Sequence, residues 1–277
     1  MQEKVLPAPA QPSATGTPVR LTLAWARARE AIEWFGELTL FCGRLIRSTL
    51  APPYELREFV RQMDEIGSKS VFLVTLAGAA TGVVLSLETR DSLSRFGAEA
   101  AMPALIVFSI IKETGPIITA LVVSGRVGAG IGAELGSMKV TEQIYAIRAS
   151  GVDPFKYLVA TRVLACMLML PLLAVVCDAW GIMMGWFATT MAEPITLHRF
   201  IDLGFQRVTF SDFLPSTLKT IVFGWIIGVV ACFQGMRATR GTRGVGLAAT
   251  SSVVIASLFI ILADVLLVRL SQVLFPR

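Results

Sequence analysis

Charged residues are scarce in this sequence of 277 residues. Asp, Glu, Lys and Arg together make up only 16%, against about 25% in ordinary globular domains, and mean hydropathy is +0.67. Several uncharged apolar runs reach 18 residues or more, enough to cross the roughly 30 Å of bilayer hydrocarbon as helix. This excludes a water-soluble enzyme, a disordered chain and a fibre. Solid apolar runs also argue against a β-barrel, whose strands alternate over about ten residues. The sequence therefore predicts an all-α membrane protein.

Catalytic and metal-binding signatures are also missing. There is a single histidine, His198, and the four cysteines show no C-x-x-C spacing, so neither a metal centre nor a redox motif is indicated. The patterns G-x-x-x-x-G-K-[ST], H-E-x-x-H and G-x-S-x-G are absent. We predict a chain that is not an enzyme and carries no cofactor. If transport here consumes ATP, another chain must hydrolyse it. The net charge of +5 fits basic loops of a membrane protein rather than nucleic-acid binding.

The first quarter of the chain differs from the rest in composition. Residues 1–19 are rich in Pro, Ala, Ser and Thr and predict a disordered tail. Residues 20–53 alternate basic residues with Trp, Phe and Leu, and end at Pro52-Pro53. Since this mixture is amphipathic and too charged to span, it predicts a helix lying in the membrane interface. A short polar helix is expected over 54–68.

Residues 54–277 form the predicted membrane domain. The third apolar run, Val163–Ala192, has 30 residues and would be about 45 Å long as helix, which is more than one membrane thickness but short for a hairpin. The segments 126–162 and 237–243 hold five and three basic residues, so the positive-inside rule places both in the cytoplasm. The third run must then cross once, with the N-terminus cytoplasmic and the C-terminus on the outer side. The five predicted spans are about 70–90, 101–126, 157–192, 213–235 and 246–270.

The segment between the second and third spans, Glu113–Pro154, is the most informative. After leaving the membrane at Gly125-Arg126, it is helical in pattern for about 25 residues and ends at Ser150-Gly151, before Asp153-Pro154 opens the next helix. Glycines at 128, 132 and 136 share one face and permit close backbone approach. Such a helix either docks into a partner or is a plain interfacial loop helix, and the spacing alone favours neither.

This segment strongly resembles the MlaE/YrbE family. Four motifs occur in order and at the family's spacing: G-R-x-G from Gly125, A-E-L-G-x-M from Ala133, T-E-Q from Thr141 and G-x-D-P from Gly151. The resemblance extends over roughly residues 55–270, and its further matching residues are Gln62, Ile66, Gly67, Ser70, Gly78, Gly82, Phe233-Gln234-Gly235, Gly244-Val245-Gly246, Ala249-Thr250 and Asp264.

The family consists of permease subunits of ABC systems that move phospholipids or other lipids across the diderm envelope. The resemblance implies a homodimer in the bacterial inner membrane that serves outer-membrane lipid asymmetry. It also implies a cytoplasmic MlaF-like ATPase that holds ATP and Mg²⁺, a periplasmic MlaD-like protein with an MCE domain and a small accessory protein. Implied ATPase-coupling residues, on a helix around 134–148, are Glu134, Met138, Thr141, Glu142, Gln143 and Arg148. Implied structural residues are Gly78, Gly82, Gly125, Arg126, Gly128, Gly151, Asp153, Pro154 and Asp264.

Lys112 and Glu113 interrupt the second apolar run. Charged residues at such depth usually face a protein interior or a wet cavity, so they either line a lipid path or form ion pairs that hold helices together. Lys112 can meet a lipid phosphate as a point charge, although the family usually has arginine there. Glu113 is expected to pair with Lys112 or with another helix. By resemblance, the apolar cavity-lining residues are Leu85, Leu93 and Phe96.

Lys219 and Asp264 are a candidate buried pair between the fourth and fifth spans, with Lys219 reaching a membrane surface as the alternative. Two other functions stay open at this stage. One is an ion-coupled secondary transporter that uses Lys112, Glu113 and Asp264 as a relay. The other is a passive membrane scaffold for a lipid carrier.

Overall fold

The computed structural model describes residues 18–50, 55–191, 194–206, 208, 210–239 and 241–274, and every element in these ranges is helical. The predicted tail at 1–19 lies almost wholly outside them. The chain divides into two units, residues 1–44 and 45–277, which are described separately. Most of the first unit is a single helix, α1 (Pro18–Leu50), whose last residues belong to the second unit.

Within the first unit, α1 exposes apolar and charged side chains together. Arg29 and Glu33 form an ion pair one turn apart, with Nε and Oε1 at 2.8 Å. Trp34 and Phe35 pack edge to face with ring centroids 5.1 Å apart. Phe35 itself is exposed, so the described part of this helix carries apolar side chains on its surface.

The second unit contains five helices that are long and apolar enough to cross a membrane, which confirms the predicted number. The third run is one helix, as predicted from loop charge: η4 (Phe155–Ala160, π-helical) leads directly into α7 (Thr161–Thr190). The separate polar helix expected over 54–68 was wrong. Residues 56–68 belong to the same continuous helix as the first span, α2 (Leu56–Ser94). The five candidate spans are α2, Glu99–Val140, Phe155–Thr190, Asp212–Met236 within α9 (Phe210–Met236) and Thr242–Ser271 within α10 (Thr242–Leu274).

The second span is a composite helix. π-helical segments occur at Ile110–Thr114 and Ser124–Gly128, the first carrying Lys112 and Glu113 and the second carrying Arg126. Such π-bulges in α-helices are frequent at functional sites. In chain order the segments are η1 (Glu99–Ala101, 3-10), α3 (Met102–Ser109), η2 (Ile110–Thr114), α4 (Gly115–Val123), η3 (Ser124–Gly128) and α5 (Ala129–Val140).

The predicted single helix of about 25 residues after Arg126 was wrong, because the chain breaks at Thr141-Glu142. Glu142 has φ +62°, in the left-handed region that stops an α-helix. A separate helix, α6 (Gln143–Ala149), follows. The predicted end is correct: Gly151 has φ +84°, a conformation that favours glycine after a helix, and Asp153 Oδ1 accepts a hydrogen bond from the Phe155 amide at 3.0 Å.

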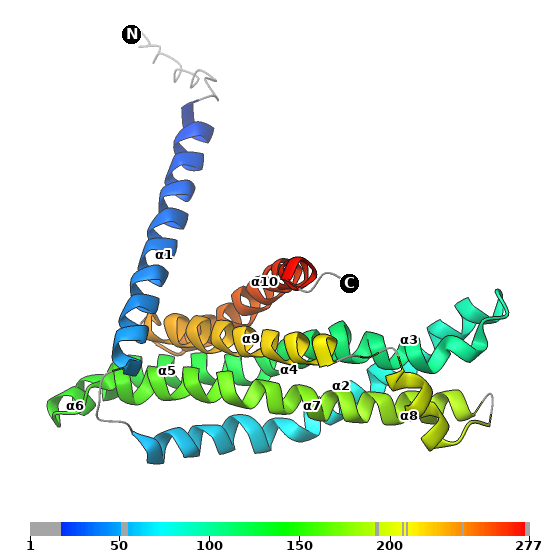
Figure 1. The fold of residues 1–277 in the computed structure, drawn as a ribbon. Helices are drawn as coiled ribbons and strands as arrows, with labels where there is room; N and C mark the ends of the chain where they lie inside the picture. Colours follow the sequence, from blue (N-terminus) through cyan, green and yellow to red (C-terminus); the bar gives the residue numbers. More distant parts are fainter. Residues whose placement is uncertain are drawn as a thin grey trace, which may run out of the picture. The chain divides into compact units, whose positions relative to one another are not determined.

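Close backbone contact joins α2 to α7, which lie side by side (Figure 1). A Cβ on Gly78 would collide with the Cys177 carbonyl, and one on Gly82 would collide with the Gly181 carbonyl. At the far end of the same interface, the hydroxyls of Ser86 and Thr189 share a hydrogen bond of 2.8 Å. Glycine therefore sets the spacing of these two helices.

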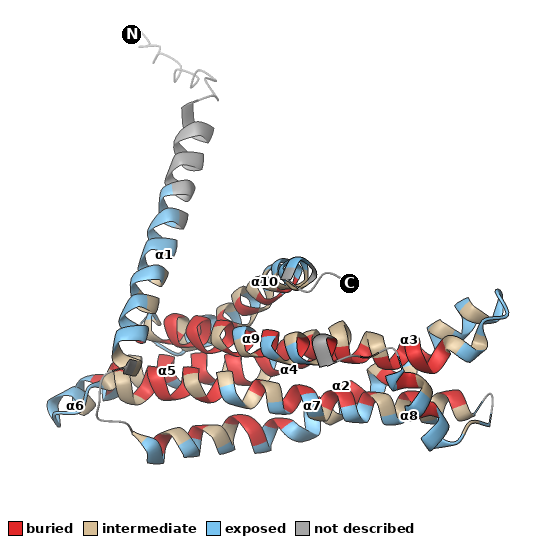
Figure 2. Cartoon of the chain, in the orientation of Figure 1, coloured by how far each residue is buried: buried red, intermediate tan, exposed pale blue. Residues whose placement is uncertain are grey.

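The helix α5 packs in the same manner against α9 and α10. A Cβ on Gly132 would collide with the Ser252 hydroxyl, one on Gly136 would press against Ala238 and one on Gly235 against Leu135. Figure 2 shows buried residues concentrated along α4, α5 and α9, whereas α6 is mostly exposed.

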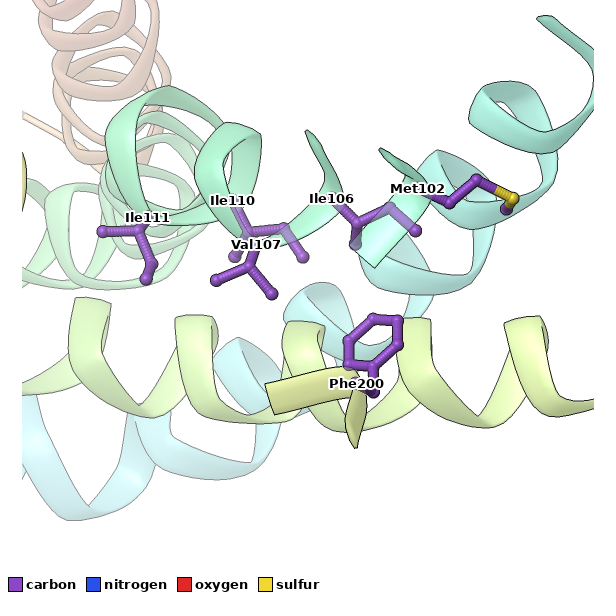
Figure 3. Close-up of a cluster of buried hydrophobic side chains, with 6 residues drawn as sticks. All are labelled: Met102, Ile106, Val107, Ile110, Ile111 and Phe200. Carbon is purple, nitrogen blue, oxygen red and sulfur yellow. The ribbon is translucent and has the colours of Figure 1, made fainter. Parts of the chain in front are cut away.

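A buried apolar cluster lies where α3 and η2 meet α8 (Leu197–Phe205). Phe200 of α8 inserts beside Ile106 and Val107 of α3 (Figure 3). The α8 helix begins at Thr196, whose hydroxyl caps it by accepting from the Arg199 amide. This cluster fixes the segment that leads into η2 and its two charges.

Candidate functional site

Lys219 of α9 forms an ion-pair cluster with carboxylates from two other spans. Its Nζ lies 3.0 Å from Glu113 Oε2 of η2 and 3.0 Å from Asp264 Oδ1 of α10. The Lys219 side chain is only 7% exposed. The structure thus contains the Lys219–Asp264 pair considered from sequence and adds Glu113, which pairs with another helix and not with Lys112. Buried charges in membrane helices are costly unless paired, and here one ammonium serves two carboxylates.

Lys112 precedes Glu113 in η2 but has different neighbours. Its Nζ lies 3.7 Å from Asp212 Oδ1 of α9 and 4.8 Å from the centroid of the Phe108 ring. The Lys112 side chain keeps 32% of its surface exposed. Since its ion pair is longer than those of Lys219 and its ammonium is open, Lys112 is chemically able to accept an additional anion.

The three predicted apolar cavity residues differ in burial. Leu85 and Leu93 of α2 pack against the buried cluster around Ile106. Phe96, in the turn after α2, is exposed. The structure therefore brings Leu85 and Leu93 to the segment that leads into η2, whereas Phe96, whose amide donates to the Leu93 carbonyl at 3.0 Å, keeps its side chain exposed.

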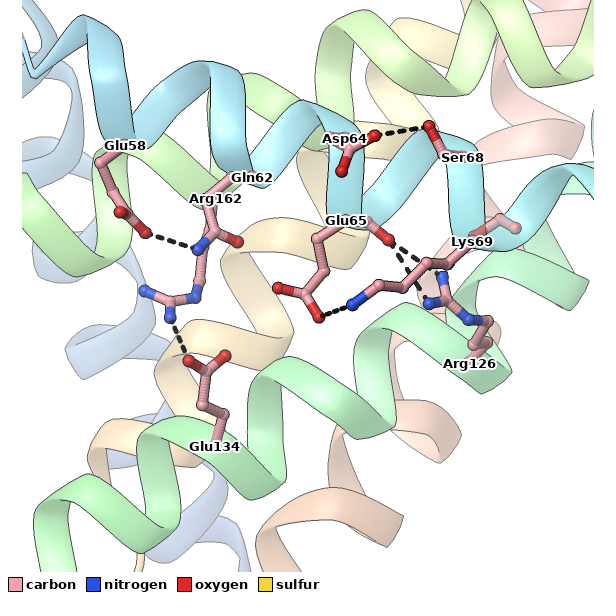
Figure 4. Close-up of polar contacts among 10 residues, drawn as sticks. Glu58, Gln62, Asp64, Glu65, Ser68, Lys69, Arg126, Glu134 and Arg162 are labelled. Atoms are coloured by element: carbon pink, nitrogen blue, oxygen red, sulfur yellow. Dashed lines mark hydrogen bonds and ion pairs between the residues drawn. The ribbon is translucent and has the colours of Figure 1, made fainter.

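Arg162, near the start of α7, is a buried cation that sequence reasoning had counted only as a loop charge. Its side chain is 2% exposed; Nη1 donates to the Leu158 carbonyl and Nη2 lies 2.8 Å from Glu134 Oε1 of α5 (Figure 4). Glu134, a predicted coupling residue, is 51% exposed. Its carboxylate is therefore already engaged within the chain, and it links α5 to α7.

Arg126 makes a second link, from η3 to α2. Its Nη1 donates to Ser70 Oγ at 2.6 Å and to the Glu65 carbonyl at 3.3 Å (Figure 4). These contacts give Arg126 a structural partner from the segment of α2 that precedes the apolar stretch. Near the start of α2, Glu58 accepts hydrogen bonds from Gln62 and from Tyr157 of η4.

The other predicted coupling residues lie around the break between α5 and α6. Met138 is half-buried, whereas the remaining four are exposed: Thr141, Glu142, Gln143 and Arg148. Ile144 is the buried residue of α6. Tyr145, which sequence reasoning missed, is exposed and lies under Lys139 Nζ at 5.3 Å from its ring centroid. Lys139 and Tyr145 are six residues apart, on either side of the break between α5 and α6, so no helical periodicity in the sequence indicates their contact.

The predicted structural glycines of the second span have looser surroundings. A Cβ on Gly125 would meet open space, and one on Gly128 would make only ordinary contacts with Ser124 and Ile227. Pro154 is the residue before η4, with helical backbone angles that suit the start of a helix.

Five candidate spans, charged residues paired within them and a polar helical break define a multi-pass membrane protein. The family model for the permease MlaE matches residues 59–270. A probable ABC transporter permease protein of Rickettsia typhi is 36% identical over 235 residues, covering 85% of this chain and 91% of that protein. A probable ABC transporter permease protein of Synechocystis is 30% identical over 234 residues, covering 83% and 89%. The Arabidopsis thaliana protein TRIGALACTOSYLDIACYLGLYCEROL 1, chloroplastic, is 30% identical over 235 residues, covering 84% and 67%.

The chain belongs to the MlaE permease family. It is an ABC transporter permease subunit and not a catalytic chain, and such a subunit works with a separate ATPase. The family carries no cofactor of its own.

Proposed function

We propose that this permease moves phospholipids between the bacterial inner membrane and a periplasmic MCE-domain carrier, and so serves outer-membrane lipid asymmetry. Two copies enclose the lipid pathway, with an ATPase on the cytoplasmic side and an accessory protein bound to that ATPase. The name of the Arabidopsis relative is that of a diacylglycerol lipid, which supports a lipid cargo with two acyl chains.

The observation that carries this proposal is the difference between the two intramembrane lysines. Lys219 is enclosed by two carboxylates, whereas Lys112 is one-third exposed and only loosely paired with Asp212. A phospholipid head needs a cation beside apolar walls, and Lys112 follows directly on the apolar cluster against which Leu85 and Leu93 pack. A relay through Glu113 and Asp264 is disfavoured because both are tied to Lys219.

The conformational change that ATP drives would start at α5 and α6. The exposed residues at their break are available to a partner, and α5 is packed through glycines onto α9 and α10, which hold Lys219 and Asp264. Movement of this segment by the ATPase would therefore be passed to the spans that carry the charged cluster. This is a two-state element biased by a ligand bound to another chain.

The N-terminal helix lies in the cytoplasmic membrane interface, and the C-terminus faces the periplasm. Exposed apolar side chains beside charged ones on α1 support the interfacial position. The basic residues of the loops at 126–162 and 237–243 support the orientation.

The test is lipid analysis of the permease purified with its ATPase in mild detergent. We expect a selectively enriched phospholipid in the wild-type complex, reduced about tenfold by Lys112→Gln, since one charged hydrogen bond contributes about 1.5–3 kcal/mol. Lys69→Gln is the matched control, because Lys69 is an exposed, ion-paired lysine of α2 and its loss should leave the lipid in place. Equal bulk membrane lipid in all three complexes would contradict the proposed site, as would transport driven by a proton gradient without ATPase.

A further inference from the structure

Asp178 is the one charged residue in the apolar run Val163–Ala192. It lies on α7, is 6% exposed, and its Oδ1 has no hydrogen-bond partner among the described residues. The function proposed above does not use it. A buried polar atom without a partner is uncommon and calls for a physical reason.

The Asp178 carboxyl occupies a niche left by a glycine. A Cβ on Gly115, the residue after the π-helical segment η2, would collide with Asp178 Oδ1. The Ile110 carbonyl borders the same niche, 3.0 Å from the position that this Cβ would take. Thr119 lies one turn further along α4 and is fully buried, with its hydroxyl against the thiol of Cys177, the residue before Asp178 on α7. The niche therefore offers a carbonyl oxygen, which can accept a hydrogen bond.

The charges around Asp178 determine whether its carboxyl group is ionised or protonated in this niche. Lys219 is the cation whose charge reaches Asp178, but Glu113 and Asp264 already hold its ammonium at 3.0 Å each. Lys112 of η2, the other cation in this region, pairs with Asp212. An ionised Asp178 would place a third carboxylate around one ammonium, inside a membrane helix and without a donor on Oδ1. That arrangement is strongly unfavourable.

We propose that Asp178 is a buried proton-binding site, occupied by a proton from water in the conformation seen here. The neutral acid can then donate a hydrogen bond to the carbonyl of the niche. It also leaves the Lys219 cluster with one ammonium and two carboxylates. Because the niche exists only while α7 lies against Gly115, proton binding is tied to the contact between α7 and the segment that carries Lys112 and Glu113. The site does not depend on the chemical identity of the cargo.

Infrared difference spectroscopy of the permease–ATPase complex at neutral pH tests this directly. We expect the wild-type spectrum minus that of Asp178→Asn to show the C=O stretching band of a protonated carboxylic acid. Asp264→Asn is the matched control: Asp264 is equally buried but ion-paired with Lys219, so its difference spectrum should lack that band. A wild-type complex in which replacing Asp178 removes only carboxylate bands would overturn the proposal.

A second variant keeps the test decisive if Asp178→Asn fails to fold. Gly115→Ala fills the niche while the Asp178 side chain remains, so the protonated-acid band should shift in frequency or disappear. In contrast, Gly125→Ala adds a methyl group to the same composite helix where the structure has open space, and it should leave the band unchanged. A band that is identical in both alanine variants would show that the acid does not reside in the niche, and would overturn the assignment.

Discussion

Lys219 and Arg162 are both buried cations of long apolar helices, but Lys219 has two carboxylate partners, one of them buried, whereas Arg162 has a single, half-exposed one. Lys219 is enclosed among η2, α9 and α10, and its partner Asp264 is buried with it. Arg162 pairs across α5 and α7 with Glu134, of which half remains exposed. Each group has one member that water can reach, Glu113 with 42% and Glu134 with 51% of its side-chain surface exposed, but Lys219 keeps a second, buried carboxylate and Arg162 does not. The comparison suggests that the Lys219 cluster fixes the spans and that the Arg162 pair is where an external partner can act.

The glycine contacts distinguish the same two regions of the molecule. Between α2 and α7, added methyl groups would strike backbone carbonyls, which cannot move away. Along α5, a methyl group on Gly132 would strike buried Ser252 and lie 3.0 Å from the Ala248 carbonyl, whereas one on Gly136 would come no closer than 3.2 Å, to Ala238. The end of α5 at Gly136 is therefore the more adaptable region, in keeping with its place near the exposed break at Glu142.

The largest effect should follow from removing the enclosed cation. Lys219→Leu leaves Asp264 buried without a counter-charge, so we expect the free energy of unfolding to fall by about 3–5 kcal/mol, the usual cost of breaking a buried pair. Thermal unfolding in detergent, followed by circular dichroism, measures the change. Lys69→Leu makes the same chemical substitution at an ion-paired lysine of α2 whose partner Glu65 is exposed with it, and it should cost about 1 kcal/mol or less. Equal losses in the two variants would mean that enclosure of Lys219 contributes nothing.

A smaller effect is expected at the half-exposed pair. Glu134→Gln leaves Arg162 buried without its counter-charge, and should cost about 1–3 kcal/mol. Arg162→Leu should cost less, because water can hydrate the Glu134 carboxylate that remains. If the two residues act as one unit, the double variant should be no worse than Glu134→Gln alone. Additive losses in this double-mutant cycle would show that the 2.8 Å contact is not energetically coupled.

Much of the fold was predictable from hydropathy and charge. Five spans, the single third helix and its start after Asp153-Pro154 follow from apolar length, basic loops and local backbone chemistry. The left-handed residue at Glu142 was not predictable, because glutamate carries no turn signal and the T-E-Q series resembles continuous helix. The merging of 54–68 with the first span was missed because a polar helical pattern does not reveal where one helix joins another.

The partners of the intramembrane charges were harder to predict than their presence. The Lys219–Asp264 pair was recognisable because each is an isolated charge in an apolar run. The partner of Glu134 was not predictable, because Arg162 lies 28 positions further along the chain and only tertiary structure brings them together. Asp178 gave a signal of the same kind as Lys219, but nothing in the sequence indicates that Gly115 makes room for it.

Substitutions at the break between α5 and α6 should have the smallest effect on stability but a large effect on association with the ATPase. Glu142 has a backbone conformation that costs a non-glycine residue about 1–2 kcal/mol. Glu142→Gly should therefore stabilise the turn by up to about 1 kcal/mol while removing the carboxylate, and Glu142→Gln should remove only the charge. If the carboxylate docks onto the ATPase, both variants should reduce the amount of ATPase that co-purifies with the permease by about tenfold. Glu134 is unsuited to this test, because its loss also frees Arg162. If Glu142→Gln binds the ATPase normally while Glu142→Gly does not, the partner recognises the rigid turn and not the charge. The exposed break between α5 and α6 would then act through its shape.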